Sequence, residues 1–282
     1  MTAPATASVL APQTRARLAR MPPVLLLAPA LIAVTFLLLP LLGLLVRAPW
    51  RDVGAIMTDP AVLEALRLSL VTATLATGLS LVLGVPLAWM LARPRFRGRA
   101  LLRALVTVPL VLPPVVGGVA LLLVFGRRGV VGGPVFDATG WSLPFTPAAV
   151  VAAETFVAMP FLVLTVEAAL RGVDPRYEAA AATLGADRWT AFRRVTLPLV
   201  GPGVAAGAVL CWARALGEFG ATITFAGSFP GRTRTMPLQV YQALDTSPAT
   251  ATVLSLLLLA VSVLVLLALR ERWLRSELRD TR

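Results

Sequence analysis

The chain contains no lysine and no histidine, and its 282 residues include a single cysteine. It therefore has no imidazole base, no Schiff-base lysine and no P-loop lysine to bind nucleotide phosphates. One cysteine, Cys211, excludes an intrachain disulfide and a thiolate zinc site. Because Cys211 lies within an apolar run, we interpret it as a small buried hydrophobe. We expect no catalytic residue, no metal site and no cofactor in this chain.

Charged residues are also scarce, at 14%, whereas 57% of the residues are hydrophobic. A soluble domain usually carries about 25% charged residues, and the mean hydropathy here is +0.82. All 26 basic residues are arginines, and with 14 acids the net charge is +12. These arginines lie between long apolar runs and not on one solvated face, so the charge indicates a lipid membrane and not a nucleic acid as the partner.

Long apolar runs fill about half of the chain. A helix that crosses a bilayer needs about 20 apolar residues. Six runs meet this requirement, at residues 24–46, 66–92, 104–126, 147–170, 199–226 and 249–269. The first run is longer than the apolar part of a signal peptide, so we expect it to be retained. The fold class predicted is an all-α integral membrane protein with six transmembrane helices.

The predicted organisation is a cytoplasmic segment 1–23, a first helix 24–46, a membrane domain 66–269 and a cytoplasmic tail 270–282. Arginine placement gives the orientation, because cytoplasmic loops are rich in basic residues. The two termini and the second and fourth loops carry 18 of the 26 arginines. Both termini and the loop 171–198 are therefore predicted to face the cytoplasm.

The third apolar run contains residues that interrupt a helix. Pro109, Pro113 and Pro114 precede the pair Gly117-Gly118, and such a sequence cannot form an undisturbed helix. A break inside a membrane is tolerated where other helices bury it or where it lines a watery cavity. We interpret the segment either as a structural kink or as a part of a transport pathway or gate.

The fifth run contains two opposite charges. Arg214 and Glu218 are four residues apart and would share one helical face. Charges are costly within a membrane, so this face should point to the protein interior or to a cavity. We interpret the two charges either as a buried structural ion pair or as part of a gate. Glu154 and Glu167 in the fourth run are further acids, and the partner of Glu154 is not evident.

The loop 171–198 has the pattern of a helical hairpin. Asp174-Pro175 is typical of a helix start, and Gly185 is expected to end this first helix. A second short helix is predicted over 186–195, and Leu197-Pro198 is expected to end the segment. The run of small residues at 179–181 suits docking into a groove on another protein.

This hairpin resembles the EAA loop of ABC-importer permeases. The family pattern is Glu-Ala-Ala, three residues, Gly, nine residues and Ile-x-Leu-Pro, and the spacing matches in full. Alanine occupies the position of the glutamate, and Glu178 stands one residue earlier. The resemblance assigns ATPase coupling to a set of loop residues: Ala179, Ala180, Ala181, Gly185, Val195, Leu197 and Pro198.

Two stretches, 214–222 and 226–235, are similar to molybdate-importer permeases, which commonly have asparagine where Ser228 stands. The similarity extends over residues 66–269 and implies the type I ABC importer permease fold. The interrupted helix and the paired charges described above give the candidate pathway or gate residues Pro113, Pro114, Gly117, Arg214 and Glu218. Sulfate and thiosulfate permeases share much of this region.

The resemblance also implies the partners. They are a second copy of the chain, cytoplasmic ATPase subunits that bind ATP and Mg, an extracytoplasmic binding protein that delivers molybdate or tungstate, and the lipid of a bacterial inner membrane. Sulfate or thiosulfate uptake is the main alternative. A stand-alone channel or secondary transporter would leave the hairpin spacing unexplained. An intramembrane enzyme is disfavoured, because no nucleophile–base pair accompanies the acids in the apolar runs.

Overall fold

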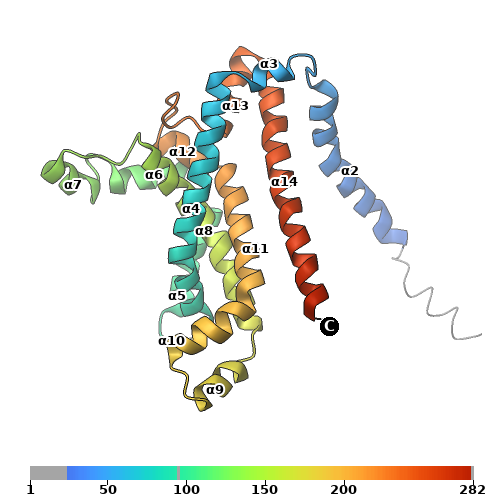
Figure 1. Ribbon diagram of the computed structural model, residues 1–282. Coiled ribbons are helices and arrows are strands. Elements are labelled where there is room, and N and C mark those ends of the chain that lie inside the picture. Colours follow the sequence, from blue (N-terminus) through green and yellow to red (C-terminus); the bar gives the residue numbers. More distant parts are fainter. Residues whose placement is uncertain (1–23, 94–95, 281–282) are drawn as a thin grey trace, which may run out of the picture. The chain divides into compact units, whose positions relative to one another are not determined.

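The computed structural model describes residues 24–93 and 96–280, and every regular element within these ranges is helical. Figure 1 shows their arrangement. The elements in chain order are α2 (Val24–Arg47), α3 (Val53–Met57), α4 (Pro60–Ala92), α5 (Arg99–Val111), α6 (Pro114–Phe125), α7 (Gly132–Thr139), α8 (Pro147–Gly172), α9 (Arg176–Thr183), α10 (Arg188–Ala191), the π-helical turn η1 (Phe192–Thr196), α11 (Leu197–Leu216), α12 (Gly220–Phe225), α13 (Met236–Thr246) and α14 (Pro248–Asp280).

The helix α2 belongs to a separate compact unit, which ends at Ala48. It covers the predicted first span, and the segment 1–23 lies outside the described residues. From Leu26 to Arg47 none of its residues is buried. Apolar side chains such as Ile32 and Phe36, exposed by 70% and 75%, would be unfavourable in water. Their exposure is the pattern of a helix that faces lipid.

Two of the long helices, α4 and α8, begin at capped prolines. The side chain of Asp59 accepts a hydrogen bond of 2.8 Å from the Ala61 amide, and Pro60 opens α4 six residues before the predicted start. Thr146 caps α8 in the same way, ahead of Pro147. Helix α14 begins at Pro248, one residue before the predicted start of the last span, and continues as a helix to Asp280.

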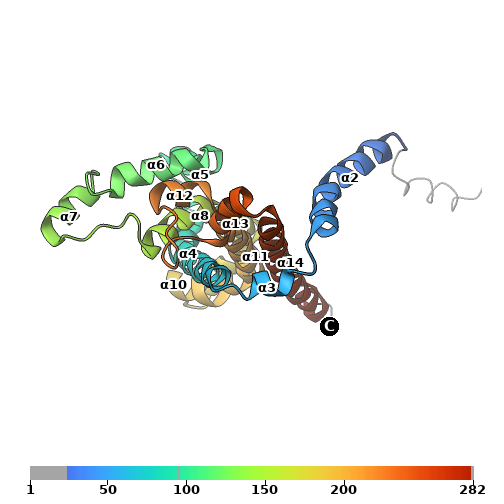
Figure 2. The same cartoon turned by 90° about the horizontal axis from the view of Figure 1, so that it is seen from above.

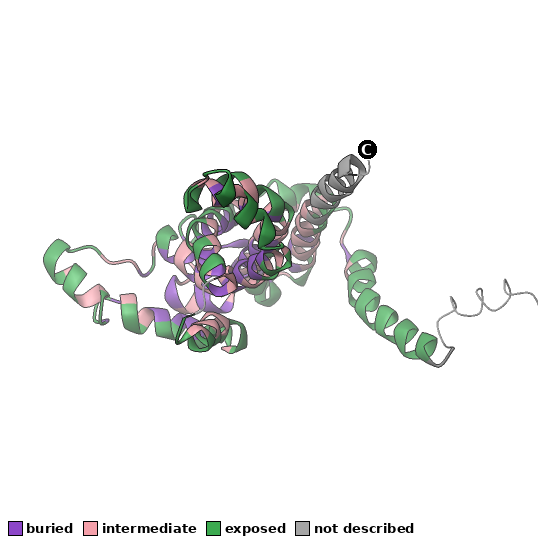
Figure 3. Ribbon diagram, turned by 90° about the horizontal axis from the view of Figure 1, so that it is seen from below, coloured by how far each residue is buried: buried purple, intermediate pink, exposed green. Residues whose placement is uncertain are grey.

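Helices α4, α8 and α11 form the core of the second unit, and small residues let them approach closely. Buried positions of α4 recur every three or four residues and include Ala73, Ala76 and Ala88. A Cβ added at Gly84 would lie 2.8 Å from Leu162 Cδ2 of α8. Close contact through small residues is how membrane helices associate. Figure 3 shows the buried residues gathered between these helices.

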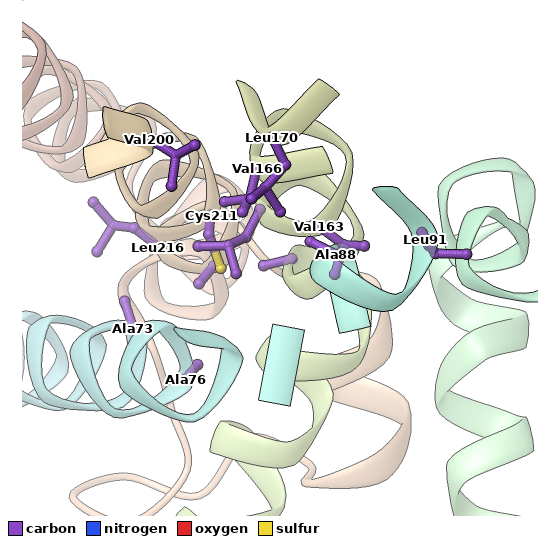
Figure 4. Packing of buried hydrophobic residues seen from close by; sticks show 13 residues of the cluster. Ala73, Ala76, Ala88, Leu91, Val163, Val166, Leu170, Val200, Cys211 and Leu216 are labelled. Carbon is purple, nitrogen blue, oxygen red and sulfur yellow. The ribbon is translucent and has the colours of Figure 1, made fainter. Parts of the chain in front are cut away.

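The largest cluster of buried residues joins the same helices. Val163 and Val166 of α8 meet Cys211 and Leu216 of α11 there, as Figure 4 shows. Cys211 is completely buried, which confirms its interpretation as a buried hydrophobe.

Among the described residues, 24–93 and 96–280, five helices are long and apolar enough to cross a membrane, and α5 with α6 makes a sixth only if this bent pair is one span. The helix direction bends by 116° between α5 and α6. The break predicted in the run 104–126 is thus confirmed, and the run is not one straight helix.

Candidate functional site

The hairpin of the loop 171–198 begins at Asp174. Its carboxylate accepts a hydrogen bond of 2.9 Å from the Arg176 amide, and α9 starts at Arg176. The first helical residue is thus one position later than predicted, because Pro175 adopts the cap position.

Gly185 ends α9, as the sequence predicts. Its φ is +86°, a backbone conformation that glycine adopts without strain. The Gly185 amide donates to the Ala182 carbonyl at 3.0 Å, and the Ala186 amide donates to the Ala181 carbonyl, also at 3.0 Å. This pair of bonds is the Schellman closure of a helix end, and it sets the turn between the two arms of the hairpin.

The second arm of the hairpin differs from the prediction at both of its ends. It begins at Arg188 instead of at residue 186, since Asp187 is the cap and accepts a bond of 3.0 Å from the Thr190 amide. Hydrogen bonds from the Thr190 side chain and backbone lower the pKa of the Asp187 carboxyl.

Leu197-Pro198 does not end the segment. Pro198 lies in the first turn of α11, where a missing amide proton is tolerated. The turn η1 joins α10 to α11, and the helix runs from Arg188 to Leu216 over 29 residues. The hairpin is therefore continuous with a membrane-spanning helix.

The outer face of the hairpin is small and apolar. Ala179, Ala180 and Gly185 are exposed, and Ala181 is half-buried. Leu184 is exposed by 89% and Trp189 by 65%. An exposed apolar patch of this kind marks a site of protein interaction. Neither Leu184 nor Trp189 was predicted from the sequence, although a large apolar residue directly beside a turn glycine, as Leu184 is, was an available signal.

Glu178 points inward and fixes the hairpin to the membrane helices. Its Oε1 accepts a hydrogen bond of 2.7 Å from Thr196 Oγ1 and lies 3.2 Å from an Arg93 guanidinium nitrogen. The carboxylate thus ties α9 to η1 and to the end of α4. Ala179 occupies the exposed position where the family pattern has glutamate. Glu178, one residue earlier, makes contacts within the protein instead.

A second ionic cluster lies at the same end of the bundle. The Glu167 carboxylate pairs with Arg103 of α5 and, at 2.7 Å, with Arg171 of α8. Only 6% of the Glu167 side chain is exposed. The two arginines compensate its charge, a pairing that was not predicted from the sequence.

The break between α5 and α6 is centred on Pro113. Leu112 and Pro113 have extended backbone conformations, and Pro114 then opens α6. The Gly117 amide donates to the Pro113 carbonyl. A Cβ at Gly117 would lie 3.1 Å from Phe156 Cε1, so this glycine allows α6 to pack against α8.

The fifth predicted span is broken as well. Helix α11 ends at Leu216, and Gly217 is its cap, so the run 199–226 is not one helix. Arg214 pairs with Glu218 at 2.6 Å. The other Glu218 oxygen accepts a bond of 2.8 Å from the Ala221 amide and thereby caps α12. The pair was predicted, but it bridges a helix break instead of lying along one helix.

The two breaks meet in space. A Cβ at Gly220 would lie 2.8 Å from Pro114 Cβ, and one at Gly118 would lie 2.7 Å from Thr224 Cβ. Both distances are too short for a side chain, so these glycines bring α6 and α12 into backbone contact. The structure therefore unites the candidate residues near Pro113 with those near Glu218. Figure 2 shows α6 and α12 side by side.

Glu154 contributes a further buried carboxylate. It is 1% exposed, and its Oε1 accepts a hydrogen bond of 2.9 Å from Thr72 Oγ1 of α4. Thr72 is the partner that the sequence left open. Within the described ranges no group of three or more His, Cys, Asp or Glu residues could hold a metal ion.

Comparison with known protein sequences gives three findings. Residues 84–276 match the family described as binding-protein-dependent transport system inner membrane component. The chain is 50% identical to the molybdenum transport system permease protein ModB of Mycobacterium bovis, over 86% of this chain and 92% of that protein. It is 37% identical to the sulfate transport system permease protein CysT of Escherichia coli, over 83% of this chain and 85% of that protein.

The fold is similar to a solved structure of a bacterial ABC transporter involved in the import of the acidic polysaccharide alginate. The TM-score is 0.69 at 19% identity, and the match covers 89% of this chain and 95% of that one. At this identity the match shows the permease fold alone.

Proposed function

We propose, from the premise that the chain belongs to the family of binding-protein-dependent transport system inner membrane components, that it is the permease subunit of an ATP-driven importer of molybdate. The 50% identity to a molybdenum permease supports this substrate over sulfate, for which the identity is 37%. Tungstate, which has nearly the same size and charge as molybdate, would share the route.

The observation that carries the proposal is the continuity of the hairpin with the broken helices. A partner that binds the exposed face around Ala179 and Leu184 and then changes shape would move the helix from Arg188 to Leu216 as one rigid body. This helix ends next to the Arg214–Glu218 pair, and α12 follows, packed against α6. Rigid-body motion of one helix can carry a change at the hairpin to a gate at the far end of that helix.

The proposed partners follow from this arrangement. ATPase subunits would bind the hairpin and hold ATP and Mg, since this chain lacks a nucleotide-binding lysine. A second copy would complete the pathway, and an external binding protein would deliver the anion. In this proposal the chain lies in the bacterial inner membrane, and both termini and the hairpin face the cytoplasm.

Arginines at the other end of the bundle support arrival of an anion there. Arg127 and Arg232 line a cavity of about 390 Å³ together with Trp141, Phe145 and Phe229. Their positive charge would raise the local concentration of an oxyanion.

The substrate is tested by competitive uptake in cells that carry the complete transport system. We expect a tenfold excess of unlabelled molybdate or tungstate to suppress uptake of labelled molybdate about tenfold, and an equal excess of sulfate to leave it nearly unchanged. Cells without this chain are the control for other routes. Equal competition by sulfate would overturn the choice of molybdate in favour of a sulfate permease.

A further inference from the structure

An apolar groove of about 500 Å³ opens where the last turns of α4 meet α10 and η1. Among its lining residues, Trp189 also belongs to the exposed apolar face of the hairpin described above. Its lining consists of one arginine and five apolar or aromatic side chains: Pro86, Trp89, Met90, Arg188, Trp189 and Phe192.

The walls of the groove are aromatic and exposed. Trp89 is exposed by 37%, Met90 by 43% and Trp189 by 65%. The Trp189 and Phe192 rings stack with their centroids 5.8 Å apart, which holds one wall in place. Because α4 ends at Ala92, the groove lies where a spanning helix leaves the hydrocarbon region. Tryptophans are enriched at this boundary of the membrane.

The rim of the groove carries positive charge. This charge comes from Arg188, which forms no ion pair within the part of the chain that the structure describes. By contrast, Arg93 is paired with Glu178, and Arg103 is paired with Glu167. An apolar groove with one uncompensated arginine in its lining matches the two parts of an anionic phospholipid, the acyl chain and the headgroup phosphate.

We propose that this groove binds one acyl chain of an anionic phospholipid, whose headgroup phosphate contacts Arg188. The occupant is lipid and not the ATPase for two reasons. Apart from the arginine, the lining offers only the tryptophan N–H groups as hydrogen-bond donors. The groove also lies beside α4, whereas the hairpin tip at α9 extends further from the bundle, as Figure 1 shows.

The test uses the purified full-length chain in phosphatidylcholine vesicles. Lipids with brominated acyl chains quench the fluorescence of tryptophans that they contact. We expect brominated phosphatidylglycerol to quench more strongly than brominated phosphatidylcholine at equal low mole fraction. Trp189→Phe should remove most of this difference, because Trp189 forms a wall of the groove. Salt at 0.5 M should weaken the difference, since it screens the arginine.

Two arginine variants separate the charge at the groove from charge in general. Arg188→Gln should raise the phosphatidylglycerol concentration that gives half of the effect by roughly fivefold. Arg176→Gln removes the same charge from α9, outside the groove, and should leave that concentration unchanged. Equal quenching by the two lipids in the unmodified chain would overturn the proposal. A loss of ATPase capture by Arg188→Gln with unchanged quenching would also overturn it, and would assign the groove to the protein partner.

Discussion

Glu218→Gln is expected to reduce molybdate uptake per membrane-inserted copy by at least tenfold. Glutamine keeps the shape of the side chain and an oxygen for the Ala221 amide, but it leaves Arg214 without its counter-charge. Removing one member of a buried ion pair lowers the stability of a protein by several kcal/mol. We expect a loss of about 3 kcal/mol, at the lower end of the range for buried pairs, because 28% of the Arg214 side chain is exposed. We expect the contact between α12 and α6 to loosen as a result. Uptake of labelled molybdate, normalised to permease abundance in the membrane, measures the effect.

Two variants serve as controls for this experiment. Glu64→Gln removes an exposed acid near the start of α4 and should leave uptake within twofold of the unmodified chain. The double variant Arg214→Gln with Glu218→Gln restores neutrality, so it should recover thermal stability but not uptake. Normal uptake by Glu218→Gln alone would refute a role of the pair in transport.

Gly185→Pro is expected to abolish capture of the ATPase subunit while membrane insertion continues. Proline fixes φ near −65°, whereas the hairpin turn requires φ of +86°. The substitution also removes the amide that donates to the Ala182 carbonyl. Both effects open the Schellman closure and displace the exposed face near Leu184. Co-purification of the ATPase subunit with the permease should fall to less than a tenth of its normal level.

Gly140→Pro is the matched control. Gly140 also has positive φ, +70°, and its amide also closes a helix end, that of α7. It lies at the other end of α8 from the hairpin. Its substitution should therefore leave ATPase capture intact. Gly185→Asn should be milder than Gly185→Pro, because asparagine tolerates the left-handed conformation. Full ATPase capture by Gly185→Pro would show that the hairpin is not the coupling element.

The helical class and several helix ends could be predicted because they depend on local chemistry. Apolar length predicted α2 and α8, and the proline pair at 113–114 predicted the break before α6. Leu197-Pro198 was read wrongly because proline is compatible with both the end of one helix and the first turn of the next. The choice depends on η1, whose π-helical turn joins α10 to α11 without a break.

The candidate site was predictable only where its residues are close in sequence. Arg214 and Glu218 are four positions apart, so their pairing was evident. The break after Leu216 was hidden, because hydropathy averages over a window and does not report backbone direction. Glu154 and Thr72 are 82 positions apart. Such a contact depends on how α4 packs against α8, which a single sequence does not specify.

Thiol labelling in intact cells tests the central claim, that the 171–198 hairpin is a cytoplasmic coupling element. Leu184→Cys places a thiol at a site exposed by 89%, and Asp137→Cys places one on α7, which precedes the other end of α8. The native Cys211 is buried and contributes little background. With a membrane-impermeant maleimide, the account predicts that Asp137→Cys is labelled in intact cells and Leu184→Cys only after permeabilisation. Labelling of Leu184→Cys in intact cells would contradict it.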